Sequence, residues 1–256
     1  MNPTVHEKAS KGFNRASDAY ERGRPDYPKE CLDFLKQHLG LKPGMKVVDL
    51  AAGTGKFTRL LAKSGADLTA VEPVEGMREK FQSLDSHTPI LNGTAEAMPL
   101  RDATVDIVTV AQAFHWFHGP LALPEIHRVL KPHGKLVMIW NVRDDSKHWV
   151  AELGHLMDEF EGSTPRYKSM QWKHSFENSA LFTPLQHHEL PHLQSGTVET
   201  MVDRVSSVSY IAAMADHERE KILNRVRKHF QTHPDTRGQE VISMPYVTHI
   251  YWCEKV

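Results

Sequence analysis

Between about residues 30 and 160, short apolar runs alternate with segments of helical periodicity, and this alternation most constrains the fold. We predict strands in the apolar runs at 45–52, 67–71, 89–91, 105–111 and 136–140. Strands that alternate with helices are typical of βαβ units, which build a parallel sheet with helices on both faces. The sequence therefore predicts an α/β, Rossmann-like fold that binds ligands at the carboxyl ends of its strands.

Beyond residue 160 the pattern is looser. Apolar and β-branched residues at 185–190 and 241–252 favour two further strands, which bring the predicted sheet to seven mostly parallel strands. Pro245 lies inside the second of these, so we expect that strand to be an edge strand, to be bulged, or to start late. The stretch 197–230 between them has helical character and is expected to cap the strand ends.

Charge and composition exclude several classes of function. The chain has 256 residues and a formal net charge of −1, so no overall field draws it to nucleic acid or to an anionic membrane. It shows neither a secretory signal at its beginning nor an apolar run of roughly 20 residues. We expect a cytoplasmic protein with no membrane or nucleic-acid partner.

The histidines and cysteines show no spacing typical of a metal site. Cys31 and Cys253 are far apart, and the 17 histidines form no recognisable ligand motif. His187 and His188 are adjacent, so in a strand their side chains would face opposite sides and could not share one metal ion. We expect no metal ligand among these residues.

The loop after the first predicted strand carries the first evidence for a cofactor. Gly53 and Gly55 allow close approach of a ligand to the backbone, and the following helix offers free N–H groups. Glu72, at the end of the next strand, can accept hydrogen bonds from a ribose diol. Asp49 would disfavour a pyrophosphate but can receive a hydrogen bond, directly or through water, from an amino-acid ammonium. Thr58 stands where a dinucleotide fingerprint has its third glycine. These features favour S-adenosylmethionine (SAM) over a nicotinamide cofactor, and so disfavour an oxidoreductase.

Five segments in this order resemble the class I SAM-dependent methyltransferases of the type 11 kind, over roughly residues 13–141. They are 49–55, Glu72-Pro73, 93–96, 106–110 and 125–134. The resemblance implies that the loop with Asp49, Ala51, Gly53 and Gly55 holds the methionine part, and that Glu72 and Pro73 border the ribose. It also implies that Ala95 and Glu96 border the adenine, and that Ala111 and Gln112 lie beside the sulfonium. Ala51 departs from the family, which often has glycine there.

The segment before the sheet offers two further candidates. Methyltransferases of the ubiquinone-biosynthesis and trans-aconitate types have a similar leading segment, and there the tyrosine borders the cofactor. By this resemblance Tyr20 would close the methyl-transfer site. Arg24 would pair with a substrate carboxylate, which its guanidinium fork matches. The alternative is that Tyr20 packs a helix and Arg24 is a surface cation.

The segment after the fourth predicted strand, Ala111-Gln112-Ala113-Phe114-His115-Trp116-Phe117, resembles one found in trans-aconitate methyltransferase-like proteins. We expect at least one of Gln112, His115 and Trp116 to line a substrate pocket. The alternative is that the aromatic residues only cover the end of the sheet. His115 is a candidate general base if the acceptor is a hydroxyl or an amine. A carboxylate acceptor needs no base and relies on alignment and desolvation. Trp140, at the end of the fifth strand, and Arg143, shortly after it, are expected to face the same crevice.

Taken together, these observations predict one methyltransferase domain over residues 1–256. Residues 1–30 would form an N-terminal cap segment, 31–160 the SAM-binding core, and 161–256 the last strands with a helical cap at about 197–232. The expected reaction is direct methyl transfer, without a metal, to a carboxylate or hydroxyl oxygen of a small molecule, by a monomer or homodimer. The alternatives are carbon methylation of a quinone-like or sterol-like substrate, and SAM binding without catalysis.

Overall fold

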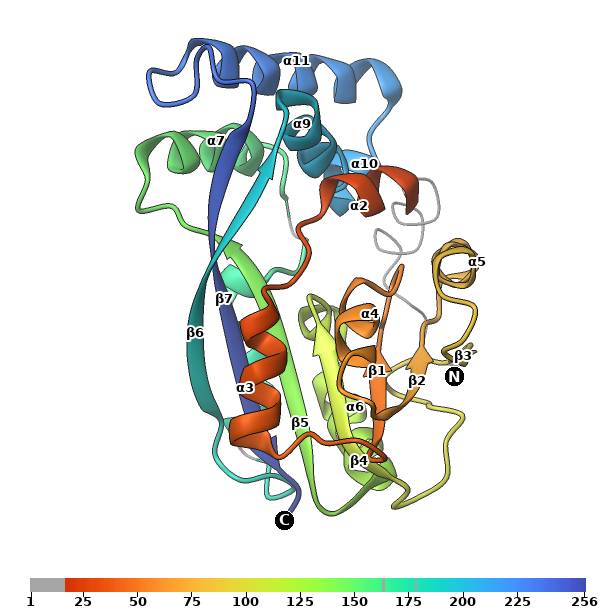
Figure 1. Cartoon of the computed structure of the whole chain (residues 1–256). Coiled ribbons are helices and arrows are strands. Elements are labelled where there is room, and N and C mark those ends of the chain that lie inside the picture. The colour runs from red at the N-terminus through yellow and green to blue at the C-terminus, as the bar shows by residue number, and fades with distance from the viewer. Residues whose placement is uncertain (1–16, 163, 178) are drawn as a thin grey trace.

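A seven-stranded sheet runs through the computed structural model, which describes residues 17–162, 164–177 and 179–256 (Figure 1). The strands lie in the order β3-β2-β1-β4-β5-β7-β6. They are β1 Lys46–Leu50, β2 Asp67–Val71, β3 Ile90–Leu91, β4 Val105–Ala111, β5 Leu130–Arg143, β6 Gln186–Gly196 and β7 Ile242–Glu254. The first five pair in parallel, and β7 is antiparallel to both of its neighbours. The predicted Rossmann-like, mostly parallel sheet is confirmed.

Helices cover both faces of this sheet (Figure 1). One face packs against α3 (Lys29–Leu39) and α4 (Lys56–Ala62), and the other against α6 (Gly119–Val129). The paired residues Val47 and Ile107 face the first group, whereas Val48 and Val108 face the second. Burial on both faces explains why these strands read as continuous apolar runs. The helices α2 (Ser17–Gly23) and α5 (Glu75–Leu84) lie on the cofactor-loop side of the molecule.

A helical cap with its own hydrophobic cluster stands above the sheet (Figure 1). It contains α7 (His148–Asp158), α9 (Val198–Ser206), α10 (Ser209–Ala212) and α11 (Asp216–Thr232), packed against the first residues of β7. The stretch predicted as helical is therefore three helices. Helix α7 joins the same cluster through Trp149 and Leu153, although the boundary predicted at residue 160 assigned it to the core. A short helix, α8 (His174–Glu177), and three 3-10 turns, η1 (Phe114–Trp116), η2 (Tyr167–Ser169) and η3 (Gln171–Lys173), lie in the connections.

Pro245 occupies a position where its missing N–H is tolerated. The pairing of β7 with β5 stops at Tyr246, so at Pro245 the strand is paired with β6 alone. The Pro245 carbonyl accepts a hydrogen bond from the Asp144 N–H at 3.0 Å. The expectation of an edge strand is thus correct only locally, because β6 covers β7 along most of its length and is itself the edge.

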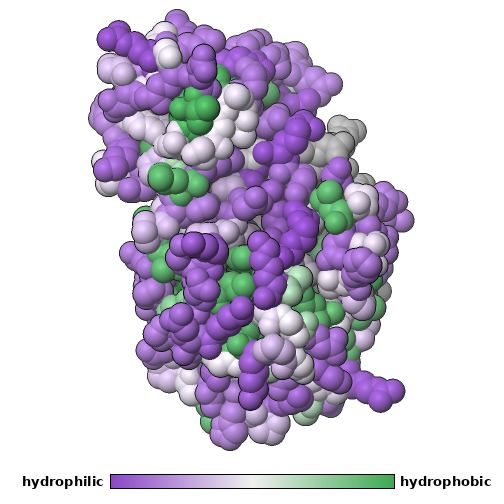
Figure 2. Space-filling view, in the orientation of Figure 1, coloured by the Kyte–Doolittle hydropathy of each residue, from purple (hydrophilic) through white to green (hydrophobic). Residues whose placement is uncertain are grey.

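The view of Figure 2 shows a largely hydrophilic surface over both the sheet and the cap, with hydrophobic side chains in small groups. Within the described ranges, the structure contains no helix with both the length and the apolar character needed to cross a bilayer.

Candidate active site

The loop between β1 and α4 adopts a left-handed backbone at three positions. The φ angles are 56° at Ala51, 58° at Gly53 and 83° at Gly55. A Cβ on Gly55 would lie 2.7 Å from the ring of Phe81, so this position has room only for glycine. At Ala51 the left-handed backbone costs a residue with a Cβ about 1–2 kcal/mol, which explains the family's preference for glycine there.

Glu72 holds this loop against the end of β2. Its Oε2 accepts a hydrogen bond from the Gly53 N–H at 2.9 Å, and its Oε1 accepts one from the Val74 N–H at 2.9 Å. Burial raises the pKa of Glu72 to about 7. The two N–H donors and the Arg78 guanidinium lower this pKa, but their effect is smaller than that of burial. Each carboxylate oxygen keeps one lone pair that can accept a ribose hydroxyl. The neighbouring Pro73 places its carbonyl 2.7 Å from Arg78 Nη1.

Asp49 lies beneath the loop and is only 1% exposed. Its Oδ2 accepts a hydrogen bond from Thr58 Oγ1 at 2.6 Å, and its Oδ1 accepts one from Thr109 Oγ1 at 3.0 Å. Thr58, where a dinucleotide site has glycine, therefore joins α4 to β1. Burial raises the pKa of Asp49 to about 6. Asp49 lines neither of the two cavities described below, so its predicted contact with a cofactor ammonium stays a prediction.

Glu21, which was not predicted from the sequence, joins helix α2 to the same loop. The Glu21 carboxylate accepts hydrogen bonds from Thr54 Oγ1 at 2.6 Å and from Arg59 Nη2 at 2.5 Å. Lys56 adds an ion pair with Asp26 at 2.8 Å. No local motif marks Glu21, because its partners follow it by more than thirty positions. The predicted N-terminal cap segment thus contacts the cofactor loop, although its residues 1–16 lie outside the described residues.

Two adjoining cavities meet at Tyr20, Arg24 and Gln112. The smaller one lies on the cofactor loop and is lined in addition by Pro25, Tyr27, Ala51, Ala52, Thr54, Lys56, Phe57 and Ala111. Gln112 has a φ of 62°, a strained value for a residue that is not glycine. Its Nε2 donates a hydrogen bond to the Asn141 carbonyl at 3.2 Å. The structure therefore brings Tyr20, Ala51, Ala111 and Gln112 together as expected.

The remaining cofactor candidates line neither cavity. Gly53 and Gly55 belong to the loop itself, Glu72 and Pro73 directly follow β2, and Ala95 is buried. Glu96 accepts a hydrogen bond from the His118 N–H at 3.0 Å. The roles predicted for these residues toward ribose and adenine therefore stay predictions.

The larger cavity lies between the strand ends and the cap. Its lining includes all six predicted substrate candidates, namely Tyr20, Arg24, His115, Trp116, Trp140 and Arg143. Further lining residues come from the cap and from the segment 164–168, and no role was predicted for them from the sequence. The cap residues include Met157, Val208, Ser209 and Tyr210. The volume is about 840 Å³, including the part open to solvent. Among the described residues, no aspartate or glutamate lines this cavity.

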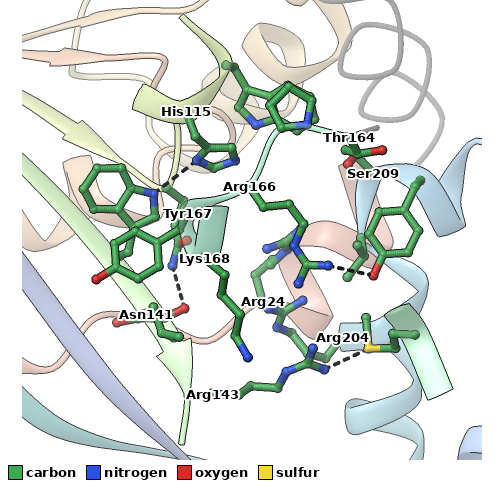
Figure 3. Close-up of a pocket in the computed structure, with 18 of the residues that line it drawn as sticks. Arg24, His115, Asn141, Arg143, Thr164, Arg166, Tyr167, Lys168, Arg204 and Ser209 are labelled. Carbon is green, nitrogen blue, oxygen red and sulfur yellow. Dashed lines mark hydrogen bonds between the residues drawn. The ribbon is translucent and has the colours of Figure 1, made fainter. Parts of the chain in front are cut away.

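Five cationic side chains gather around the cavity: Arg24, Arg143, Arg166, Lys168 and Arg204 (Figure 3). Of these five, only Arg24 and Arg143 are predicted from the sequence. Arg166 has a carboxylate partner in Glu161, with Nη1 to Oε2 at 2.6 Å. Lys168 pairs with Asp145 at 2.7 Å.

The other three arginines, Arg24, Arg143 and Arg204, make no ion pair with any carboxylate of the residues that the structure describes. Arg143 donates a hydrogen bond from Nη1 to the thioether sulfur of Met157, a weak acceptor, at 2.8 Å. Arg24 reaches the Ser207 carbonyl at 3.0 Å, and its Nε is a buried donor without an acceptor, as is Arg204 Nη1.

Burial, together with the positive charge of Arg204, lowers the pKa of Arg24 and of Arg143 to about 10. Guanidinium groups with such pKa values remain charged at neutral pH. Buried charge without a partner is costly. An anionic ligand would supply the negative charge that the described lining residues do not provide.

His115 is held as a neutral imidazole. Its Nδ1 accepts a hydrogen bond from the indole Nε1–H of Trp140 at 3.2 Å (Figure 3). Burial, with the charges of Arg24 and Arg166, lowers the pKa of His115 to about 3. The single proton therefore sits on Nε2, and neither ring nitrogen keeps a free lone pair. This arrangement makes His115 a hydrogen-bond donor and argues against the general-base role considered above.

Comparison with known proteins supports the interpretation of the loop and the sheet. A methyltransferase-domain family matches residues 48–138. An uncharacterized methyltransferase of Mycobacterium tuberculosis is 38% identical over 239 residues, which cover 93% of each chain. An uncharacterized methyltransferase of Schizosaccharomyces pombe is 32% identical over 248 residues, 93% of this chain and 94% of that one. A malonyl-[acyl-carrier protein] O-methyltransferase of Serratia marcescens is 30% identical over 141 residues, 53% of this chain and 54% of that one.

Solved structures share the fold. A candidate type II methyltransferase from Anaeromyxobacter dehalogenans superposes with a TM-score of 0.67 at 19% identity, over 91% of this chain and 97% of that one. A phosphoethanolamine N-methyltransferase of Haemonchus contortus, solved with S-adenosylhomocysteine, gives a TM-score of 0.56 at 12% identity, over 99% of this chain and 60% of that one. With the glycine loop, the acidic end of β2 and the strand order, these matches establish that the chain belongs to the class I SAM-dependent methyltransferases.

Proposed function

We propose that this methyltransferase transfers the SAM methyl group to a carboxylate oxygen of a small anionic acid. The observation that carries the proposal is the cavity with three arginines, Arg24, Arg143 and Arg204, that have no carboxylate partner among the described residues. Because no acidic side chain from the described part of the chain lines that cavity, a negatively charged ligand would compensate the arginines. Guanidinium groups suit this task, since they bind carboxylates in a bidentate manner.

The state of His115 supports a carboxylate over a hydroxyl acceptor. A hydroxyl must lose its proton during transfer, and the neutral imidazole has no lone pair available to take it. A carboxylate oxygen is already a nucleophile. Its lone pair forms the new bond to the methyl carbon, the carbon–sulfur bond breaks, and the electron pair goes to sulfur. The products are a methyl ester and S-adenosylhomocysteine, with no proton to remove.

The residues at the junction of the two cavities would align this displacement. Tyr20 and Gln112 border both the cofactor loop and the cationic cavity, so the transferable methyl group would emerge between them. The Nε2–H of His115 would donate to the acceptor or to its neighbouring oxygen. Alignment and exclusion of water then supply the rate enhancement.

Three unpaired guanidinium groups favour a substrate with more than one negative charge. Methylation neutralises the reacting carboxylate, so a second anionic group is needed to keep a partner for the arginines in the product complex. Arg143 and Arg204, at the cap side of the cavity, would hold that second group. The alternative of a quinone-like or sterol-like substrate fits this lining less well, because such molecules would place apolar rings against buried charge.

The test is a screen of mono-, di- and tricarboxylic acids for methyl transfer from radiolabelled SAM. We expect ester formation with at least one acid of two or more carboxylates. Arg143→Met should raise the KM of that acid at least about 10-fold, the loss typical of a charge-assisted hydrogen bond. Arg225→Met is the matched control, because Arg225 is an exposed cation of the cap that pairs with Glu159 away from the cavity.

Two results would overturn the proposal. Transfer to a quinone or sterol and to none of the acids would establish the carbon-methylation alternative. Binding of S-adenosylhomocysteine without transfer to any acceptor would establish a SAM-binding protein that is not catalytic.

A further inference from the structure

Outside the active site, two histidines and one glutamate converge on one face of the β6–β7 pair. His187 and Glu189 alternate along β6 and so share a face, and His249 stands opposite Glu189 in the register of β7. The three candidate ligand atoms form a small triangle. His187 Nε2 lies 3.1 Å from His249 Nδ1, and Glu189 Oε1 lies 3.2 Å from His249 Nδ1 and 3.7 Å from His187 Nε2.

These separations are those that a tetrahedral transition metal requires. Zinc binds imidazole nitrogen and carboxylate oxygen at about 2.0–2.2 Å, which places its ligand atoms roughly 3.3 Å apart. Two of the observed separations, 3.1 and 3.2 Å, are slightly shorter than this value, and the third, 3.7 Å, is longer. Two imidazoles and one carboxylate form a ligand set that suits zinc and its neighbours in the first transition row. One cation could therefore contact all three atoms with little movement.

Without a cation, the hydrogen-bonding capacity of the three side chains cannot be satisfied within the triangle. His249 Nδ1 lies within reach of both His187 Nε2 and Glu189 Oε1, but it can only accept from the first or donate to the second. Burial lowers the pKa of His187 and of His249, which favours the neutral imidazoles that metal binding requires. A bound cation would accept a lone pair from each of the three groups at once.

The surroundings make the triangle both rigid and accessible. The ring of His187 stacks on Tyr251, with centroids 4.1 Å apart. The side chains of His187 and Glu189 are 36% and 55% exposed, so an ion can enter from solvent. The ammonium of Lys173, which lies over the Tyr251 ring at 4.7 Å, is the nearby charge that opposes a cation.

We propose that His187, Glu189 and His249 form a binding site for a divalent transition-metal cation, with zinc as the best match. Water would complete the coordination. The ion would join the edge strand β6 to β7 and would take no part in methyl transfer. The site is still close to the active site, because Tyr167 lines the substrate cavity and its hydroxyl lies 3.0 Å from that of Tyr251.

The test is calorimetric titration of the full chain, without a histidine tag, with Zn²⁺, and in parallel the visible absorption of Co²⁺ as a reporter of coordination. We expect saturable Zn²⁺ binding that weakens at least about 10-fold in Glu189→Gln and in His249→Gln, since each removes one of three ligands. Lys173→Met removes the opposing charge and should tighten binding. Thermal unfolding of each variant verifies folding, and the exposed Glu189 gives an informative variant even if His249→Gln is unstable.

His188→Gln is the matched control. His188 neighbours the site in sequence but faces the opposite side of the sheet, where it stacks on Phe34 with centroids 4.5 Å apart. Its substitution should leave Zn²⁺ binding unchanged. A second group in the cap consists of His148, Glu152 and His233, and there the two histidines approach different oxygens of the Glu152 carboxylate, each at 3.5 Å. Zn²⁺ binding that survives Glu189→Gln and His249→Gln but is lost in His148→Gln would overturn the proposal, as would no Zn²⁺ binding at all.

Discussion

The indole N–H of Trp140 donates a hydrogen bond to Nδ1 of His115 at 3.2 Å and thereby determines what this histidine can do. The ring is left with its proton on Nε2, and burial keeps it neutral by lowering its pKa to about 3. His115 should therefore act as a donor to the acceptor molecule.

We predict that His115→Gln retains most of the methyl-transfer activity, because an amide N–H can replace the Nε2–H. Loss of a general base would cost about 10²- to 10⁴-fold in kcat. We expect a decrease of less than about 10-fold, measured as kcat with saturating SAM. His115→Leu, which keeps the bulk without a donor, is the comparison and should be less active than His115→Gln. A loss of three orders of magnitude in both variants would show that the imidazole is a base after all.

Cofactor affinity should depend on pH through Glu72. Its pKa is raised to about 7, so the carboxylate that is predicted to accept ribose hydroxyls becomes protonated as the pH falls through 7. Calorimetric titration with S-adenosylhomocysteine should therefore show weaker binding at pH 6 than at pH 8. Glu72→Ala should abolish binding in the micromolar range. Glu72→Gln should bind more weakly than wild type with a smaller pH dependence. An unchanged pH dependence in Glu72→Gln would assign the titration to another group. Asp49, whose pKa is raised to about 6, would then be the next candidate.

Ala51→Gly should be better tolerated than a neighbouring glycine substitution. At Ala51, with φ at 56°, glycine relieves about 1–2 kcal/mol of backbone strain, which offsets the entropy that glycine adds to the unfolded chain. At Ala52, which lies outside the left-handed positions, no strain is relieved. We expect the free energy of unfolding of Ala51→Gly to exceed that of Ala52→Gly by about 1 kcal/mol in urea titrations. Equal values for the two variants would contradict strain at Ala51.

Gly23→Ala should separate α2 from the cap. A Cβ there would lie 2.4 Å from backbone atoms of Asp203 and Arg204 in α9. Relieving this clash would require the backbone of one helix to shift, which costs free energy of folding. Overpacking of this kind costs about 1–3 kcal/mol. Because Arg24 follows directly, the KM of the anionic substrate should rise as well. Gly154→Ala in α7 is the control, since its Cβ would meet nothing within 4 Å and helix propensity favours alanine. The proposed contact is wrong if the two variants unfold at the same denaturant concentration.

Much of the fold and of the cofactor loop could be predicted from the sequence, because these features depend on local order. Strands buried on both faces produce uninterrupted apolar runs, and crossover helices produce periodic ones. Gly53, Gly55 and Glu72 are recognisable because each follows a strand end, where parallel strands present their ligand-binding residues. The same reasoning placed Gln112, His115 and Trp140 at one edge of the sheet, where the structure shows them.

Only the tertiary structure decided the character of the cationic cavity proposed to bind the substrate. Arg166 and Arg204 come from a loop and a helix of the cap, and no periodicity of the sequence relates them to Arg24 or Arg143. The tautomer of His115 depends on the indole of Trp140, and the histidine–glutamate triangle joins residues 62 positions apart. Sequence patterns record which face of an element is buried. Contacts between distant elements depend on how those faces pack, so the charge and the proton positions of this site emerge only in the folded chain.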